Sequence, residues 1–177
     1  MTIRDRVLLM CLWLSVIALT TWVGGTLYQM LVVVPLWSAS PPETVRAFFQ
    51  GTDYNRTIFN FFGPPFMVAR NAPLIAALLV GWHRRLHRNA LLIAVLCFTV
   101  FGVVYTFTSI YPINAVLFAR AGGAHSSDQI RAMVTTWIFR DRVRFGVGLI
   151  GFFAMLWAFR LPIPADRSDQ RKQSRLS

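Results

Sequence analysis

The chain has 177 residues, of which 55% are hydrophobic and only 14% are charged, and its mean hydropathy is +0.52. Soluble domains are usually about half apolar and about a quarter charged, so this composition indicates an integral membrane protein. The formal net charge is +11. A basic soluble protein would suggest a nucleic-acid partner, but the sequence has no nucleic-acid-binding motif, and its long apolar runs favour membrane topology and anionic lipid as the explanation.

Four apolar runs predict an all-α fold, an integral membrane four-helix bundle with short helical extensions on the outer side. A span needs about 20 residues to cross about 30 Å of hydrocarbon. The predicted spans are about 8–34, 64–82, 90–111 and 143–160. Residues 1–162 then form one transmembrane domain, and the polar, proline-bearing segment 163–177 is predicted to be a disordered basic cytoplasmic tail.

The connection after the first span, about 35–63, carries a helix-start signal in "SPPE". Ser40 is predicted to be the N-cap, with Pro41 at the first helical position. Glu43, three residues after Ser40, completes the pattern of a capping box. A short helix through "TVRAFFQ" should follow.

The third span should end or kink at Pro112, because proline cannot donate a backbone hydrogen bond. In the connection that follows, about 112–142, Ser126 or Ser127 is a predicted N-cap with Gln129 behind it. The fourth helix is therefore expected to begin well before its apolar run and to enter the membrane unbroken.

Basic residues in the short segments predict the orientation, because cytoplasmic flanks are enriched in Lys and Arg. They precede the first span, fill the connection between the second and third, and follow the fourth: Arg4, Arg6, Arg84, Arg85, Arg88, Arg160, Arg167, Arg171, Lys172 and Arg175. Both termini are predicted to be cytoplasmic, and the expected location is the inner (plasma) membrane of a bacterium.

Two arginines lie deeper than the predicted membrane boundary. Fifteen uncharged residues separate Arg144 from Arg160, and 13 separate Arg70 from Arg84. At 1.5 Å per residue these intervals span only about 22 Å and about 20 Å, short of the hydrocarbon thickness. Either both side chains snorkel to the headgroups, or they share a polar pocket that opens outward.

Neighbouring residues could complete such a pocket. Asp141 lies one turn from Arg144 and is a candidate ion-pair partner. Trp137, about two turns before Arg144, is a predicted aromatic wall. Asn114 lies two residues after Pro112, where it either caps the end of the helix or donates into the pocket.

Metal and thiol chemistry are not expected. His83 and His87 have the i, i+4 spacing of some metal sites, but arginines surround them and no third ligand lies nearby. Cys11 and Cys97 lie in different apolar runs and are expected to be buried, inert thiols. The sequence therefore predicts no metal and no other cofactor.

Three stretches together resemble the anthrone-oxygenase-like family of small four-span membrane proteins, much of which is described only as a domain of unknown function. They are "WVGGTLYQMLVVVP" in the first span, "YPINAVL" after the third, and "TTWIFRDRVRFGVGL" in the last helix. The resemblance covers roughly 8–160. It implies a four-helix membrane bundle and, in characterised relatives, the cofactor-independent oxygenation of anthrone-type polyketides to anthraquinones.

The candidate residues suit that chemistry. An anthrone loses a proton beside its carbonyl, and the enolate reacts with oxygen; a buried cation and an amide stabilise such an oxyanion. The catalytic candidates are Arg144, Asn114 and Asp141, the last being the one nearby acid. The candidates for substrate binding are Arg70, Asn71, Trp137 and Arg140.

A different class of function stays open: a non-enzymatic membrane bundle that binds a lipid or quinone-like ligand, or a partner protein. Its outward basic groups would hold a phosphate or carboxylate head. The expected partners are membrane lipids and an apolar small molecule, with a homo-oligomer left open.

The orientation gives the first testable prediction. Reporter fusions in the 83–88 connection and after residue 165 should both read cytoplasmic, because the basic residues of these segments favour that side. An external signal from either fusion would contradict the orientation and the depth assigned to the two arginines.

Overall fold

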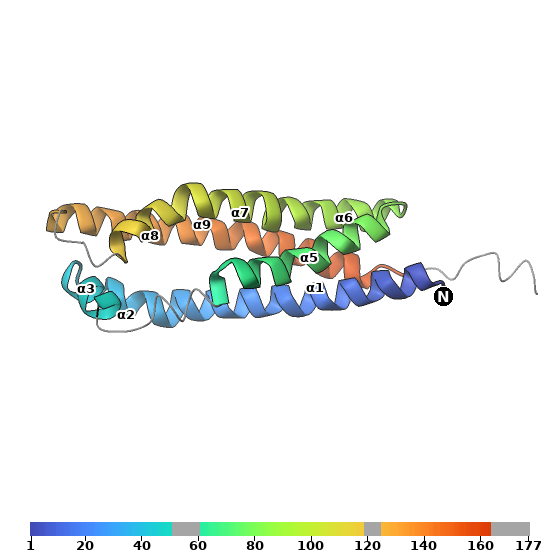
Figure 1. The fold of residues 1–177 in the computed structure, drawn as a ribbon, viewed down its shortest axis with the longest axis horizontal. Coiled ribbons are helices and arrows are strands. Elements are labelled where there is room, and N and C mark those ends of the chain that lie inside the picture. The colour runs from blue at the N-terminus through green and yellow to red at the C-terminus, as the bar shows by residue number, and fades with distance from the viewer. Residues whose placement is uncertain (51–60, 119–124, 164–177) are drawn as a thin grey trace, which may run out of the picture.

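The computed structural model describes residues 1–50, 61–118 and 125–163, and these residues are helical apart from short turns and ends (Figure 1). Four helices are long and apolar enough to cross a membrane: Ile3–Ser38, Pro64–Gly81, Arg85–Leu117 and Ser127–Arg160. The predicted all-α fold with four spans is therefore confirmed. The predicted disordered tail lies outside the described residues from 164 onward.

The first span is a continuous helix made of three segments. It consists of α1 (Ile3–Tyr28), the π-helical segment η1 (Gln29–Val33) and α2 (Val34–Ser38). The helix thus continues beyond the predicted end at 34 and passes through Pro35, which lies just after the π-helical pairing of η1.

The predicted short helix exists as α3 (Glu43–Gln50). Its first turn is stabilised differently from the prediction, because Thr44 rather than Glu43 reaches back to Ser40. The hydroxyl of Thr44 accepts from the N–H of Ser40 at 3.2 Å and donates to the carbonyl of Trp37 at 2.7 Å.

The second span is α5 (Pro64–Gly81), and the third is α6 (Arg85–Val95), η2 (Leu96–Phe101), α7 (Gly102–Tyr105), η3 (Thr106–Ile110) and α8 (Tyr111–Leu117). Pro112 does not end the third helix, which continues to Leu117. Pro112 lies in the first turn of α8, directly after the π-helical segment η3. The backbone hydrogen bonds there already depart from the α-helical pattern, so the helix can pass through a residue that has no N–H.

The fourth span is α9 (Ser127–Arg160), a 34-residue helix about 51 Å long. Its predicted capping box is confirmed with Ser126 as the N-cap. The Ser126 hydroxyl accepts from the N–H of Gln129 at 3.3 Å, and the Gln129 side chain accepts from the N–H of Ser126 at 2.9 Å. The helix extends well beyond the hydrocarbon thickness, as expected.

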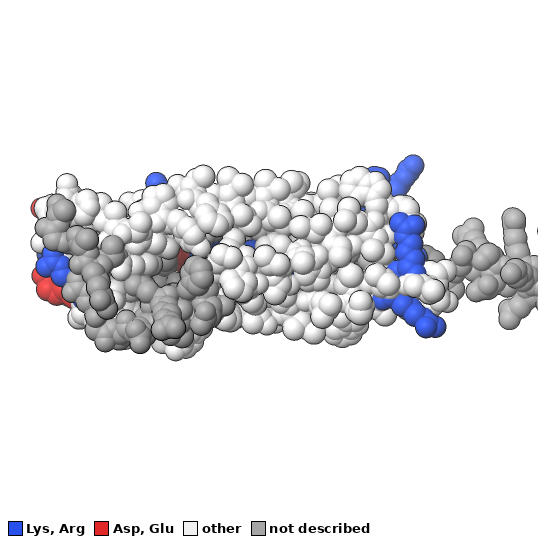
Figure 2. Space-filling view, viewed as in Figure 1, with Lys and Arg blue, Asp and Glu red and all other residues white. Residues whose placement is uncertain are grey.

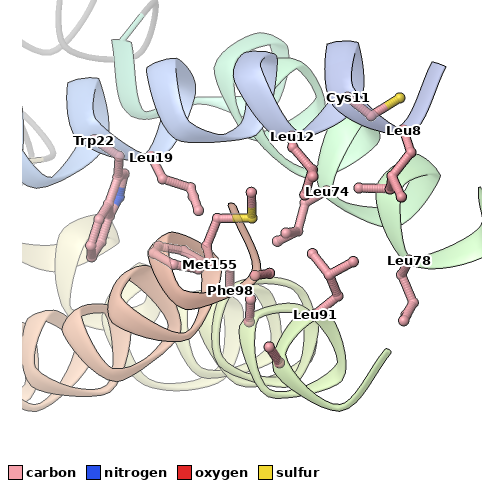
Figure 3. Close-up of a cluster of buried hydrophobic side chains, with 14 residues drawn as sticks. Leu8, Cys11, Leu12, Leu19, Trp22, Leu74, Leu78, Leu91, Phe98 and Met155 are labelled. Atoms are coloured by element: carbon pink, nitrogen blue, oxygen red, sulfur yellow. The ribbon is translucent and has the colours of Figure 1, made fainter. Parts of the chain in front are cut away.

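The four long helices pack in a ring, in which α1 contacts α5 and α9, and α6 contacts the same two helices. Each helix contributes a fully buried side chain to the apolar core near the N-terminal end of the bundle (Figure 3): Leu19, Leu74, Leu91 and Met155. A second apolar cluster lies at the far end, where α2, α3 and α8 are found (Figure 1), and includes Trp37, Ile110, Ile130 and Trp137.

The helix α5 has only 18 residues, or about 27 Å, and is much shorter than the other three spanning helices. It lies beside the half of α1 nearer the N-terminus (Figure 1). The far half of the bundle is therefore built without it, and the second apolar cluster fills that space.

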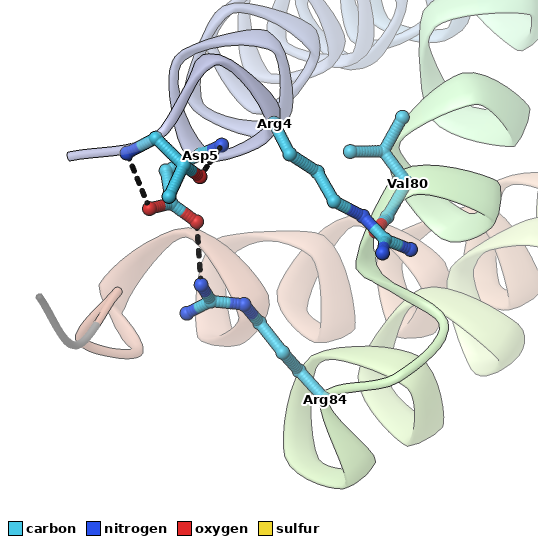
Figure 4. Close-up of polar contacts among 5 residues, drawn as sticks. Arg4, Asp5, Val80 and Arg84 are labelled. Atoms are coloured by element: carbon cyan, nitrogen blue, oxygen red, sulfur yellow. Dashed lines mark hydrogen bonds and ion pairs between the residues drawn. The ribbon is translucent and has the colours of Figure 1, made fainter. Parts of the chain in front are cut away.

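Basic side chains gather at the end of the bundle that carries the N-terminus (Figure 2). One of them ties two helices together: Nη2 of Arg84, in the turn after α5, lies 2.6 Å from Oδ1 of Asp5 in the first turn of α1 (Figure 4). Beside this pair, Nε of Arg4 donates to the carbonyl of Val80 at 3.1 Å. The start of α1 is thus fastened to the α5–α6 turn.

The i, i+4 spacing of His83 and His87 does not place them on one helix face, as that spacing would in a continuous helix. The helix α6 begins only at Arg85, which leaves His83 exposed in the turn, while His87 is buried on α6.

Replacing Asp5 by Asn should lower the thermal midpoint of the purified protein. Asp5 both pairs with Arg84 and accepts from the N–H of Thr2 at 3.0 Å, so the change removes the charge that joins α1 to the α5–α6 turn. Asp128→Asn is the matched control, because its pair with Arg131 is exposed and such pairs contribute little. Equal midpoints for the two variants would contradict a structural role for the Asp5 pair.

Candidate functional site

Arg70, on α5, lies inside the bundle rather than at its surface. Its side chain is only 4% exposed. The guanidinium carbon lies 5.4 Å from the ring centroid of Trp22 and 5.1 Å from that of Phe98, so the cation contacts two aromatic faces. The long side chain therefore does not snorkel to the headgroups.

The π-helical segment η2 shapes the surroundings of Arg70. At its end, the N–H of Gly102 donates to the carbonyls of Cys97 and Thr99, five and three residues earlier, and not to that of Phe98. The carbonyl oxygen of Phe98 instead accepts from Nη2 of Arg70 at 3.5 Å. A π-helical turn thus supplies a backbone acceptor to a buried cation, and such turns are frequent at functional sites.

Arg144, on α9, forms an ion pair with Asp141 one turn earlier, as predicted. Its Nη1 also donates to the hydroxyl of Thr106 at 3.5 Å. Asp141 is 1% exposed, and its second carboxylate oxygen, Oδ2, is buried without a hydrogen-bond partner among the described residues. Oδ1 of Asp141 is therefore paired with Arg144, and Oδ2 is an acceptor that is not used by the described residues.

Arg70 and Arg144 line the same cavity, so the structure brings together the two arginines singled out by their depth. The cavity measures about 20 Å³, which is room for about one water molecule. Its remaining wall is mainly apolar and includes Trp22, Phe66, Met67, Cys97, Phe98, Thr106 and Gly148. An aromatic ligand does not fit inside it.

Asn114 is not among the residues that line this cavity. Its side-chain oxygen accepts from Nε1 of Trp137 at 2.6 Å, and Trp137 belongs to the apolar cluster at the far end. The structure therefore places Asn114 and Trp137 as a separate pair farther along the bundle, because the third helix continues past Pro112 and carries Asn114 away from the arginines.

Asn71 and Arg140 both join helices. The amide of Asn71 donates to the carbonyl of Met67 at 2.7 Å and accepts from the hydroxyl of Thr99 at 2.9 Å. Nη1 of Arg140 donates to the carbonyl of Ser109 at 2.7 Å. Asn71 thus links α5 to η2, and Arg140 links α9 to η3.

A larger space lies between the far half of the first helix and α9. This groove measures about 640 Å³, within the range of small-molecule sites. It is lined by Met30, Leu31, Val34, Pro35, Ser38, Ala39, Trp137, Ile138, Asp141 and Arg142. Trp137 and Asp141 belong to its wall, and the partner of Asp141, Arg144, lines the small cavity.

The Asp141–Arg144 pair therefore connects two spaces of different size, an apolar groove that fits a small molecule and a cavity that fits one water-sized group. In the space-filling view, few acidic and basic atoms are visible along the flank between the two ends of the bundle (Figure 2).

Several residues of the cavity were not singled out as site candidates by sequence reasoning: Trp22, Phe98, Thr106 and Gly148. The available signal was the four-residue spacing of Arg144 and Gly148, which places them on one face of α9. Gly148 packs against Trp22, because a Cβ at this glycine would overlap the indole ring.

The described residues contain no group of three or more His, Cys, Asp or Glu side chains that could hold a metal ion. Among the described residues, the groups that could bind a small molecule are the charged and polar side chains around the cavity and the groove.

A family model described as anthrone oxygenase matches residues 54–154, more than half of the chain. No curated protein and no solved structure matches. The matched range includes Arg70, Asp141 and Arg144, whereas the part of the first helix that lines the groove precedes it.

Replacing Gly148 by Ala should destabilise the protein and disturb the cavity, because the added methyl group overlaps the ring of Trp22. The matched control is Gly146→Ala on the same helix, where nothing lies within 4 Å of the added Cβ. This control should be neutral or stabilising, since Ala is favoured over Gly in a helix by about 1 kcal/mol. Thermal unfolding of both variants tests this, and a Gly148→Ala midpoint at or above that of the control would refute the close packing.

Proposed function

Because the chain belongs to the anthrone oxygenase family, we propose that it catalyses the cofactor-independent oxygenation of an apolar, anthrone-type aromatic substrate. The observation that carries this proposal is the ion pair of the buried Asp141 with the partly buried Arg144, in which Asp141 lies at the wall of a groove of small-molecule size. It supplies a carboxylate and a cation together, with side chains that are 2% and 12% exposed.

The groove is the proposed substrate site. Its lining is mostly aliphatic and includes one aromatic wall, Trp137, which suits a flat apolar ligand. The indole of Trp137 is held by Asn114, so Asn114 is proposed as a positioning residue. Arg140, fixed to the third helix through Ser109, is proposed to hold α9 in register beside the groove.

Proton removal is proposed as the first step. Oδ2 of Asp141 takes a proton from the ring carbon opposite the carbonyl, while Oδ1 stays paired with Arg144. A positioned general base contributes about 10²- to 10⁴-fold in rate. The negative charge moves to the carbonyl oxygen of the resulting enolate, and the positive charge of Arg144 stabilises it more strongly in a dry site than in water.

Oxygen then reacts with the enolate carbon. That carbon gives an electron pair to form a bond to dioxygen, and the proton held by Asp141 passes to the terminal oxygen, which yields a hydroperoxide. The hydroperoxide then loses water, which is formed from its terminal OH group and the second hydrogen of the same carbon, and that carbon becomes the quinone carbonyl. The substrate itself is oxidised, dioxygen is reduced to water and the new carbonyl oxygen, and the scheme requires no other electron donor.

The setting proposed for this reaction is a bacterial inner (plasma) membrane with both termini in the cytoplasm. The basic residues at the N-terminal end of the bundle support that orientation (Figure 2). The groove then lies toward the outer side, and the bilayer would concentrate an apolar substrate beside it. Membrane lipids and this substrate are the proposed partners.

Purified protein incubated with an anthrone under air should form the anthraquinone, with matching oxygen uptake, faster than the uncatalysed reaction. Asp141→Asn should lower kcat by at least about 100-fold, because the amide cannot accept the proton. Arg144→Lys should also lower kcat, since an ammonium does not reproduce the planar guanidinium fork that contacts Asp141 and Thr106.

The control for Asp141→Asn is Asp128→Asn, the same chemical change at an exposed position of the same helix, and it should retain wild-type kcat. Binding of the anthrone without any turnover by the wild type would favour the non-enzymatic alternative, a bundle that binds a quinone-like ligand. Full activity of Asp141→Asn would rule out the proposed base.

A further inference from the structure

We propose that the cavity between Arg70 and Arg144 is a binding site for a single small monovalent anion of halide size. The proposal goes beyond the oxygenation reaction and does not rest on it. It concerns the cavity of about 20 Å³, and not the groove assigned to the aromatic substrate.

The buried charges in the middle of the bundle do not balance. Asp141 forms its ion pair with Arg144, whereas none of the described carboxylates lies within ion-pair distance of Arg70. Arg70 is nevertheless 4% exposed, and a guanidinium cannot release its proton in a protein. The middle of the bundle therefore holds two cations and one anion, and a buried uncompensated charge is strongly unfavourable.

Both arginines also have hydrogen-bond donors that are not used. Nε of Arg70 and Nε of Arg144 are both buried, and neither has a hydrogen-bond partner among the described residues. The contacts of the Arg70 guanidinium are two ring faces and one carbonyl at 3.5 Å. These contacts are weak, and Nε is free to donate a charge-assisted hydrogen bond to an anion.

The volume of the cavity limits the size of the ion that it can hold. A cavity of about 20 Å³ holds about one water-sized group. Chloride and bromide are of that size, whereas sulfate, phosphate and a carboxylate with its carbon are larger. The wall is otherwise mainly apolar, and burying charge there costs less for a singly charged halide than for a multiply charged oxyanion. The cavity therefore selects for a small, singly charged anion.

The direct test is equilibrium dialysis of the detergent-purified protein against radioactive chloride in a sodium gluconate buffer. The wild type should bind one saturable chloride per chain. Bromide should displace it, and sulfate at equal ionic strength should not. Absence of saturable chloride, or displacement by sulfate as readily as by bromide, would overturn the proposal.

Matched variants locate the site. Arg70→Gln should weaken chloride binding by about tenfold or more, the loss expected for a charge-assisted contact. Arg131→Gln removes the same charge from an exposed position and should leave binding unchanged. Equal binding by both variants would place the chloride elsewhere on this basic protein and would refute the assignment.

A second measurement uses the wild type alone, so it stands even if Arg70→Gln fails to fold. Crystals grown with bromide should show an anomalous peak between the guanidinium groups of Arg70 and Arg144. The absence of a peak there, under bromide concentrations that saturate the dialysis site, would also refute the proposal.

Discussion

The burial of a positive charge is the constraint on which the middle of this bundle depends. Arg70 carries a guanidinium into the interior of the bundle, and the neighbouring elements adapt to it. Trp22 of α1 and Phe98 of η2 present ring faces, and the Phe98 carbonyl accepts a hydrogen bond. Gly148 of α9 leaves room for the indole. Four elements thus share one cation.

The lengths of the helices decide where this charge lies. Arg70 is in the second turn of α5, near the end at which that short helix begins. At this level the packing changes from four long helices to three, with one apolar cluster on either side. Close packing of a regular bundle is interrupted at such a change, and the cavity and the groove both lie near it. The dry clusters on either side lower the local dielectric and strengthen the charge interactions between them.

The two π-helical segments of the third helix, η2 and η3, contact the two arginines. The segment η2 exposes the carbonyl used by Arg70, and η3 begins at Thr106, which contacts Arg144. An apolar run of ordinary composition does not indicate a π-helical turn. Such a turn depends on hydrogen bonds from side chains of neighbouring helices to the backbone carbonyls that it leaves unpaired. The prediction that the third helix ends or kinks at Pro112 overlooked this, and Asn114 consequently lies beside Trp137 instead of beside the arginines.

The sequence by itself determined the membrane class, the four helices, the capping of α9 and the family, because hydrophobic run length, capping patterns and motifs are local properties. It also indicated the depth of Arg70 and Arg144 and the partner of Arg144, since helical rise and i, i+3 spacing suffice for both. Only the tertiary structure decided that the two arginines share one cavity and that Asp141 also faces a separate groove. The physical reason is that the rotation of each helix about its axis, and the pairing of side chains such as Trp22 with Gly148, are set by packing between segments far apart in the chain.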